Sequence, residues 1–304
     1  MNLKQFKYVL VLSQEGSFSG AAEVLNISQP SLSQYVKKIE NELGMPLFDR
    51  TGGNVRLTDA GIAYIDAGRK ILDIERQLQG SLTDIKDNKI GTLTVGTSPF
   101  RSAATMPDIV KEFKLKYPGI HVVVHEADTA SLMEGLEHGE FDLCLTMLPV
   151  NEQLFDYEKI CEEEMVLAVP AAYPRMQTSN AKNRAYDAVN VGQIHGKSFI
   201  AITETQFMQR AFDSMCAKYG VIVQKCVTVK SLEAQIAMVK AGLGMAFVPG
   251  EIKSFCKDDE VVFYSFEEDI PRREIVVVWR KDGALTKVSR ELIQIMKTVS
   301  ANKK

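Results

Sequence analysis

A long helical pattern divides this sequence into two unlike parts. From Thr58 to about Asp87 the pattern is uninterrupted, and its apolar residues fall on the a and d positions of a heptad repeat. They are Tyr64, Ala67, Ile71, Ile74, Leu78 and Ile85, with an interruption at Ser81 that Leu82 partly restores. A solitary helix would expose this stripe to water, so the helix needs either a core in its own domain or a partner helix.

The sequence before this helix is helical, and the sequence after it alternates. Residues 1–57 show helical patterns, one tight turn and a glycine-rich tip, TGGN, at 51–54. From Gly91 onward, short β-rich runs alternate with amphipathic helices, which is typical of an α/β domain. Two βαβα sets, with a last strand and helix returning late, predict two lobes connected by crossing strands: lobe I at about 90–163 and 267–304, and lobe II at about 164–266.

Strands and helices can be placed along this second part. The predicted strands are Thr92–Thr97, His121–Glu126, Leu143–Met147, Met165–Val169, Ser198–Ile202, Ile222–Val229, Met245–Val248, Val261–Phe266 and Ile275–Trp279. The predicted helices lie at about 102–117, 129–138, 205–219, 231–241 and 286–299.

Composition favours a globular protein of the cytoplasm. Of the 304 residues, 45% are hydrophobic and 25% are charged, as in ordinary globular domains. No run approaches the ~20 apolar residues that span a bilayer, and polar residues directly follow the apolar patch at Val9–Leu12, unlike in a signal peptide. Residues 1–58 carry six basic and five acidic side chains, 6 − 5 = +1, so nucleic-acid binding must be argued from motif and geometry.

The cysteines and histidines give no sign of a metal site or a disulfide framework. The cysteines are odd in number and form no CxxC pair: Cys144, Cys161, Cys216, Cys226 and Cys256. His121 and His125 lie in strand sequence, where ~3.3 Å per residue puts them ~13 Å apart, too far for one ion. A redox switch that uses Cys216 and Cys226 lacks a clear thiolate-stabilising cluster nearby. We therefore expect no metal, and thiols that mostly fill the core.

Residues 17–50, SFSGAAEVLNISQPSLSQYVKKIENELGMPLFDR, predict two helices joined by a tight turn at Asn26–Ile27. Ser28 is a good N-cap for the second helix, and Pro30 suits its first turn. The apolar residues of this helix recur at spacings of four, three and four: Leu32, Val36, Ile39 and Leu43. One face of the second helix is therefore predicted to be buried.

The opposite face of the second helix is polar, as in a recognition helix of a helix-turn-helix. Gln and Ser at its exposed start can bond to base edges in the major groove, and its lysines can reach phosphates. Past Gly44, MPLFDRTGGNVRLT predicts a hairpin wing with an arginine on each side of the tip. The candidate DNA contacts are Ser28, Gln29, Pro30, Ser31, Ser33, Gln34, Lys37, Lys38, Arg50 and Arg56. The alternative is a generic helical hairpin with polar solvent faces.

The segment from Leu3 through Ala60–Gly61, including residues 17–50 and the following LTDAG, resembles the N-terminal domain of LysR-type transcriptional regulators. Weaker similarity continues in TLTVGTS (92–98), YPGIHVVVHEADTASLMEGLEHGEFDLCL (117–145) and AGLGMAFVP (241–249), which look like the periplasmic-binding-protein-like effector domain of that family. Many members have Arg where this chain has Gln34, so the operator sequence cannot be taken from relatives.

The resemblance implies an α/β protein with three parts: a winged helix-turn-helix DNA-binding domain at 1–57, a linker and dimerisation helix at 58–89, and an effector-binding domain at 90–304. It also implies a cytoplasmic, ligand-responsive regulator that binds double-stranded DNA at an inverted repeat. The expected partners are a second copy of the chain, as a homodimer or homotetramer, a small-molecule effector, and RNA polymerase if the protein is an activator.

Six residues are candidates for effector binding, because hydroxyl groups beside helix N-termini suit a carboxylate or other anion. They are Thr97, Ser98, Arg101, Thr129, Thr146 and Thr203. We expect four hydroxyl groups from different strand ends to converge on one cleft between the lobes that takes a small organic acid or amino-acid-like metabolite: Thr97 or Ser98, Thr129, Thr146 and Thr203. Arg101 either counters the charge of the effector or is solvated, and Asp128 more naturally caps its own helix.

Two other classes of function remain to be weighed. A periplasmic solute-binding protein would share the C-terminal fold, but the missing signal peptide and the helix-turn-helix oppose it. An enzyme would need catalytic groups, and no GxSxG, HExxH or Walker A motif or nucleophile–base pair is present. The acidic runs at 139–142 and 162–164 are interpreted as solvated turn and strand-edge residues. We therefore expect neither an enzyme nor a cofactor.

Overall fold

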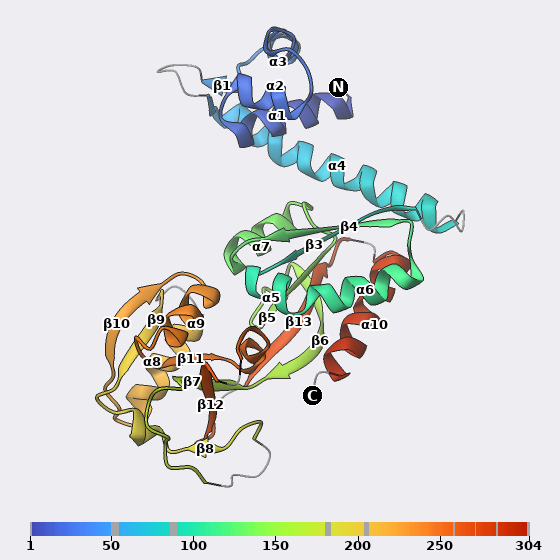
Figure 1. Ribbon diagram of the computed structural model, residues 1–304. Coiled ribbons are helices and arrows are strands. Elements are labelled where there is room, and N and C mark those ends of the chain that lie inside the picture. Colours follow the sequence, from blue (N-terminus) through green and yellow to red (C-terminus); the bar gives the residue numbers. More distant parts are fainter. Residues whose placement is uncertain are drawn as a thin grey trace.

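The computed structural model describes residues 2–49, 55–85, 90–179, 184–203, 207–257, 259–270, 272–283 and 285–302. A helical head, one long helix and a two-lobed α/β domain follow one another along the chain (Figure 1). None of the described helices combines the length and the apolar character needed to cross a membrane.

The head is a three-helix unit with a short hairpin. Its elements are α1 (Leu3–Glu15), α2 (Phe18–Val24), α3 (Gln29–Leu43), β1 (Phe48–Asp49) and β2 (Arg56–Leu57). The helices begin at the side-chain caps Asn2, Ser17 and Ser28, each of which accepts a hydrogen bond from a backbone N–H of the first turn. Asn26, with φ of 52°, makes the tight turn between α2 and α3 in the left-handed region.

The linker helix α4 (Asp59–Ile85) begins two residues after β2, the last strand of the head. Thr58 caps it, because its Oγ1 accepts the N–H of Gly61 at 3.0 Å while donating to the carbonyl of Pro46 at 2.7 Å. A Cβ at Gly61 would stand 2.1 Å from the carbonyl oxygen of Leu47, so only glycine fits there. The first half of α4 packs on α1, where Phe6 stacks on Tyr64 with ring centroids 4.9 Å apart.

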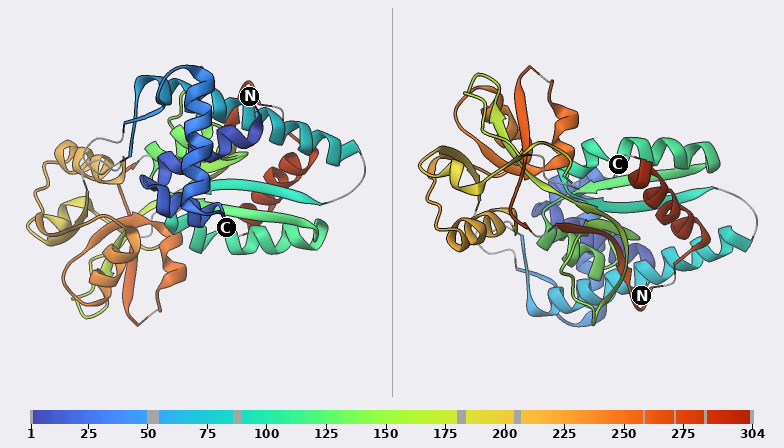
Figure 2. Two further views of the ribbon diagram at one scale, coloured as in Figure 1. Left: turned by 90° about the horizontal axis from the view of Figure 1, so that it is seen from above. Right: turned by 90° about the horizontal axis from the view of Figure 1, so that it is seen from below.

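Lobe I is a five-stranded sheet with helices on both faces. Its order is β4-β3-β5-β13-β6, with β3, β4 and β5 parallel and β13 antiparallel to both of its neighbours. Its elements are β3 (Gly91–Thr97), α5 (Pro99–Ala104), α6 (Met106–Lys116), β4 (Ile120–Glu126), α7 (Thr129–Glu137), β5 (Leu143–Met147), β6 (Phe155–Glu163), β13 (Arg273–Arg280) and α10 (Lys287–Asn302). α6 and α10 lie side by side on one face through Phe113, Leu292 and Met296 (Figure 2), and α7 covers the other with Leu132 and Leu136.

Lobe II has a sheet of order β11-β7-β12-β8, extended by the parallel pair β9–β10 through a bridge between Phe199 and Met245. Its elements are β7 (Met165–Pro170), β8 (Ala188–Val189), η2 (Val191–Ile194), β9 (Ser198–Ile202), α8 (Phe207–Lys218), β10 (Gln224–Val229), α9 (Leu232–Lys240), β11 (Ala246–Pro249), η3 (Gly250–Phe255) and β12 (Val261–Phe266). Phe212 of α8 and Ile236 of α9 are buried in the two separate cores of this lobe.

The two lobes are joined by the chain and by packing. The chain passes from β6 to β7 and returns from β12 to β13. In addition, Phe100 of α5 is only 4% exposed and belongs to the same apolar cluster as Val166 and Ile252 of lobe II. Its ring centroid lies 5.8 Å from that of Phe255 in η3. The start of α5 is therefore anchored in the core of the other lobe.

The structure differs from the sequence-based expectations at one helix, one strand and one acidic run. The helix expected at 102–117 is broken at Thr105, because Pro107 is tolerated only in a first turn and so starts a new helix, α6. The nine-residue strand β6 was not predicted, because it contains Lys159 and a run of glutamates at its end. That run was interpreted as solvated, yet Glu163 is only 5% exposed.

Candidate nucleic-acid interface and ligand site

The start of α3 is a polar surface that faces solvent. Its exposed members are Ser28, Gln29, Pro30, Ser31, Gln34, Lys37 and Lys38, while Ser33 is half-buried. Ser28 caps the helix, and its Oγ lies 2.7 Å from Oγ of Ser31. The two glutamines and the two lysines project freely enough to reach a base edge or a phosphate.

The opposite face of α3 fixes this surface in place. Leu32, Val36 and Ile39 are at most 1% exposed in the core of the head, as their spacing predicted. Glu40 also fixes the wing, since its Oε1 accepts the backbone N–H groups of Leu47 at 2.9 Å and Phe48 at 3.2 Å. Sequence reasoning missed Glu40, because its partners are backbone groups beyond the end of the helix.

The wing is partly described. β1 and β2 pair antiparallel, with Asp49 opposite Arg56, and Arg56 is exposed at the base of the hairpin. Arg50 and the glycine-rich tip at 51–54 lie outside the described residues. Of the two wing arginines, Arg56 is therefore the one that the structure describes, and it faces solvent.

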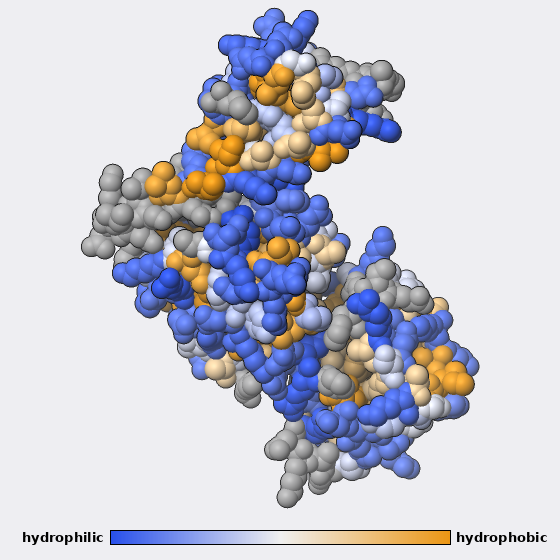
Figure 3. Space-filling model, turned by 180° about the vertical axis from the view of Figure 1, so that it is seen from behind, coloured by the Kyte–Doolittle hydropathy of each residue, from blue (hydrophilic) through white to orange (hydrophobic). Residues whose placement is uncertain are grey.

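The apolar stripe of α4 meets two different environments. Tyr64 is buried in the head against Phe6, which is the own-domain packing that the sequence left open. Further along, α4 leaves the head and its apolar side chains face solvent (Figure 3). Their exposed fractions are 37% for Ile71, 64% for Ile74 and 58% for Leu78. These three residues are called the α4 stripe below.

Two of the predicted effector residues do not share a face of the sheet. Thr97 is fully buried, and its Oγ1 donates to the carbonyl of Leu145 at 3.0 Å. Thr97 is the register partner of Leu145 across β3 and β5, so Thr146, the next residue, points to the opposite face. Thr146 is only 4% exposed. The expected convergence of hydroxyl groups is therefore wrong for this pair, because side chains alternate along a strand.

The other three hydroxyl residues lie at strand-to-helix junctions. Ser98 caps α5, where its Oγ accepts the N–H of Arg101 at 3.4 Å. Thr129 is exposed at the first position of α7, whose cap is Asp128, as expected. Thr203 follows β9 and is half-buried, and its backbone N–H donates to Val229 at 2.9 Å.

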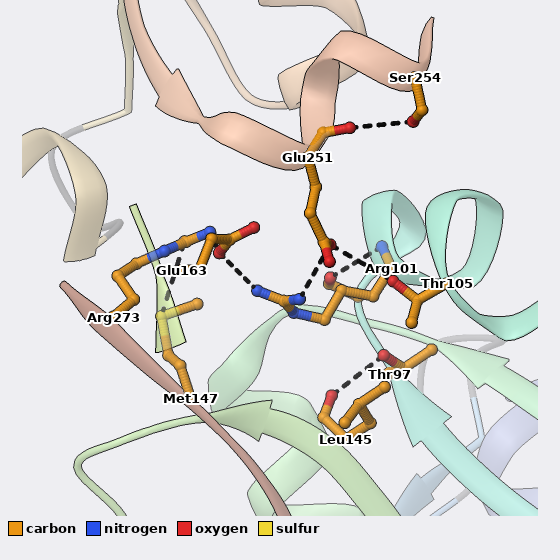
Figure 4. A network of polar contacts seen from close by, with 10 residues as sticks. Thr97, Arg101, Thr105, Leu145, Met147, Glu163, Glu251, Ser254 and Arg273 are labelled. Carbon is orange, nitrogen blue, oxygen red and sulfur yellow. Dashed lines mark hydrogen bonds and ion pairs between the residues drawn. The ribbon is translucent and has the colours of Figure 1, made fainter. Parts of the chain in front are cut away.

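Arg101 lies in a buried ion network between the lobes (Figure 4). Its guanidinium donates to Glu163 at 2.9 Å, and Glu163 also accepts from Arg273. All three side chains are 4% exposed. Glu251, from η3 of lobe II, is 3.6 Å from Arg101 and 3.4 Å from the hydroxyl of Thr105. Arg101 is thus neither solvated nor a free counter-charge for an effector.

Charge balance explains why this network is stable. Burial alone would raise the pKa of Glu163, but the adjacent Arg273 and Arg101 outweigh it and hold the pKa below its ordinary value. Glu163 is therefore ionised at neutral pH. Two buried arginines and one buried glutamate leave one positive charge, which Glu251 balances from the other lobe. Oε1 of Glu163 and Nε of Arg273 have no hydrogen-bond partner among the described residues.

A small cavity inside lobe II is lined by β9, β10, α8 and α9. Gln209 accepts the N–H of Ile202 at 3.0 Å, and Gln235 donates to the carbonyl of Ile200 at 2.7 Å. Oε1 of Gln235 lacks a described partner. The cavity volume of about 10 Å³ has room for one water and not for a metabolite.

Two of the five thiols, those of Cys144 and Cys216, are buried, whereas Cys161 and Cys256 are half-buried. Burial raises the pKa of Cys144 to about 12 and that of Cys216 to about 11. Cys226 is exposed, and its Sγ is 3.3 Å from the carbonyl oxygen of Phe199. Among the described residues, no group of three or more His, Cys, Asp or Glu side chains could hold a metal ion.

Comparison with known proteins finds two family matches along the chain. Residues 3–62 match the family described as "Bacterial regulatory helix-turn-helix protein, lysR family", and residues 86–301 match "LysR substrate binding domain". An "Uncharacterized HTH-type transcriptional regulator YcgK" of Bacillus subtilis (strain 168) is 28% identical over 97% of this chain and 94% of its own length. A "Hydrogen peroxide-inducible genes activator" of Haemophilus influenzae is 28% identical over 82% of this chain and 80% of its own. A full-length OxyR variant from Pseudomonas aeruginosa has the same fold, with a TM-score of 0.73 at 24% identity, covering 99% of this chain and 94% of that one.

Proposed function

This chain belongs to the LysR family of bacterial transcriptional regulators, and we propose that it binds an inverted-repeat operator as a homodimer or homotetramer. We further propose that its C-terminal domain senses a small organic acid or amino-acid-like anion. The family consists of DNA-binding regulators with an effector domain, and not of enzymes. Such a regulator works in the cytoplasm, and an activator also contacts RNA polymerase.

One observation carries the oligomeric part of the proposal: the α4 stripe is exposed although it is apolar. Ile74 and Leu78 expose 64% and 58% of their surfaces one turn apart on the same helix. A second α4 would cover them at the usual a and d spacing. Two recognition surfaces on one rigid pair of helices match the two-fold symmetry of an inverted repeat.

Three hydroxyl residues support the proposed effector class. Ser98 and Thr129 stand at the starts of α5 and α7, and Thr203 follows the end of β9. The first turn of a helix has backbone N–H groups without partners inside the helix. These groups favour a carboxylate-bearing metabolite over a cation. Thr97, Thr146 and Arg101 are left out of this proposed site, because their polar groups are buried or already paired.

The name of the Haemophilus influenzae relative raises peroxide as another signal. A thiol sensor of peroxide works through a thiolate that peroxide can reach. Burial keeps the thiols of Cys144 and Cys216 protonated, with pKa values of about 12 and 11. These two thiols are therefore unsuited to sense peroxide, and we propose a bound metabolite in preference to a peroxide signal that uses either of them.

The test is a mobility-shift assay combined with sedimentation. The full chain is expected to shift the DNA upstream of its own gene and to sediment as a dimer or larger species. Leu78→Glu should weaken both the DNA shift and the self-association, because it places a charge in the α4 stripe. Ile62→Glu, at an exposed apolar position on the opposite face of α4, is the matched control and should behave like the parent. A monomeric parent, or a dimer unaffected by Leu78→Glu, would overturn the proposed dimerisation.

A further inference from the structure

The side chain of Arg69 leaves α4 and contacts lobe I. One guanidinium nitrogen, Nη1, donates to Nδ1 of His138 at 2.7 Å, and Nη2 lies 3.4 Å from Oε1 of Glu140. The Arg69 side chain is 19% exposed, although it projects from a helix with an open apolar stripe. In Figure 1, α4 passes over the end of lobe I that carries α7. The contact joins two parts of the protein that the sequence separates by 69 residues.

The chemistry of this contact is specific for arginine. A guanidinium has only donors, so His138 must accept through Nδ1 and carry its proton on Nε2. His138 also ends α7: its backbone N–H bonds to the carbonyls of Glu134 and Leu136. The cation thus meets a ring nitrogen, a carboxylate and the negative end of a helix together. Lysine could not span the first two in the same way.

Both ends of the contact are rigid. On lobe I, Leu136 of α7 is fully buried, and a Cβ on Gly135 would come within 2.6 Å of the Phe141 ring. On the linker, Gly68 lies against α1, where a Cβ would stand 2.7 Å from the ring of Phe6. Arg69 therefore connects a helix packed in the effector domain with a helix packed in the DNA-binding head. A change in this contact changes the angle between the two.

We propose that Arg69 is a positioning residue that fixes the direction of α4 on lobe I and thereby sets the spacing of the half-sites that the protein reads. This rests on the proposed function, in that a dimer must read two half-sites. The helix that receives Arg69 begins at Thr129, one of the proposed effector residues, and ends at His138. A ligand that displaces α7 would therefore change the contact between Arg69 of α4 and His138 of α7.

The experiment uses the full chain and duplex DNA. The parent first selects its half-site from random duplexes, and probes then carry either one half-site or two at spacings stepped by one base pair. Arg69→Gln should leave affinity for the single half-site within about twofold and lower the discrimination between spacings about 5- to 10-fold, the usual size of a coupling between sites. Lys70→Gln removes the same charge from the exposed neighbouring residue and should keep the profile of the parent.

A double-mutant cycle separates the contact from a general effect on folding. His138→Phe keeps a ring but removes the acceptor, so it should flatten the spacing profile as Arg69→Gln does. The double variant should be no worse than either single one. An Arg69→Gln protein with the parent's spacing profile would overturn the proposal, as would fully additive effects of the two substitutions.

A second measurement needs no DNA. It distinguishes failure of the proposed role of Arg69 from failure of the proposed DNA binding. Spin labels are placed at the exposed positions Ala63 on α4 and Glu137 on α7 as noncanonical residues, leaving the native thiols unlabelled. Excess unlabelled chain restricts the distances to one protomer. Arg69→Gln should broaden the distance distribution, whereas Lys70→Gln should not. A distance distribution that Arg69→Gln leaves unchanged would contradict the role proposed for Arg69, whatever the DNA experiment shows. If no selected duplex binds the parent, it is operator binding that is refuted.

Discussion

Glu163 and Arg273 face each other across the two strands that carry the chain between the lobes. They are direct register partners at the end of β6 and the start of β13, and their side chains, each 4% exposed, form an ion pair. Arg101 joins the pair from α5, and Glu251 from η3. The place where the lobes meet is therefore bound by charge as well as by the buried ring of Phe100.

Removing the central carboxylate should strongly destabilise the effector domain. Glu163→Gln leaves Arg101 and Arg273 buried without their shared anion, which costs about 3–5 kcal/mol of unfolding free energy when a buried pair loses one partner. Urea unfolding followed by the fluorescence of Trp279 in β13 would measure it. The control is Glu162→Gln, whose side chain is 41% exposed in its ion pair with Lys159 and should matter by less than about 1 kcal/mol. Equal losses for both variants would refute this account.

The same carboxylate should make stability sensitive to acid. Because the folded protein holds the pKa of Glu163 below its ordinary value of 4.5, this group adds stability above that value, and the stability is lost as the pH falls through the folded pKa. The difference in unfolding free energy between the parent and Glu163→Gln should therefore shrink from pH 7 to pH 4 and below. A difference that stayed constant or grew on acidification would mean that Glu163 is not ionised in the fold.

Substitutions in the head should affect DNA binding in two different ways, depending on whether the residue contacts bases or phosphates. Ser33→Ala or Gln34→Ala should change sequence preference, since one base contact is worth ~1–3 kcal/mol. Arg56→Ala should instead weaken binding to specific and scrambled duplexes alike and reduce the salt slope by about one. Titrations of both duplexes over a range of salt concentrations would compare the three variants. Identical behaviour of Ser33→Ala, Gln34→Ala and the parent on both duplexes would remove the start of α3 from the interface.

The thiols should react in an order set by burial. At pH 8, a pKa of about 11 leaves about one thiolate in a thousand at Cys216, and Cys144, with a pKa of about 12, has fewer. Iodoacetamide should modify the exposed Cys226 first and leave these two intact until the protein unfolds. Peptide mass spectrometry would follow each site, with Cys226→Ser as the control. Rapid alkylation of Cys216 in the folded protein would contradict its protection by burial and would favour a thiol-based sensor at this residue.

A methyl group at Gly61 should disturb the head. In Gly61→Ala the new Cβ would stand 2.1 Å from the Leu47 carbonyl oxygen, a backbone atom that cannot rotate away. The start of α4 and the wing must then separate, and we expect a loss of about 1–3 kcal/mol, as for other overpacked sites. Gly20→Ala is a milder control, because its nearest neighbour is the Ser17 hydroxyl at 3.0 Å. Thermal melts of the two variants would rank them, and equal melting temperatures would contradict the close approach.

Local patterns in the sequence predicted local structure well. The strands expected at Leu143–Met147, Ser198–Ile202 and Val261–Phe266 have those bounds, and the caps Ser28 and Asp128 act as expected. Each depends on residues within a few positions, where propensity and capping decide the outcome.

Features that depend on distant partners could not be predicted in this way. Glu163 looked like a solvated residue, because its burial requires Arg101 and Arg273, which are 62 and 110 residues away. The failure of Thr97 and Thr146 to converge follows from the register of β3 and β5, which neither strand reveals alone. The contact of Arg69 with His138 likewise exists only once α4 has been placed on lobe I.

The position of β13 has a consequence for the growing chain on the ribosome. β13 lies between β5 and β6, so lobe I cannot close until residues 273–280 have been made, long after the head and α4 are complete at residue 85. Domains fold as units during synthesis, the N-terminal one first. A nascent chain that stops anywhere in lobe II therefore carries a finished DNA-reading head and a half-built sheet, in which β5 is paired only with β3 and β6 has no neighbouring strand. For this architecture, a truncated translation product has a folded end that reads DNA and an incomplete effector domain at the other end.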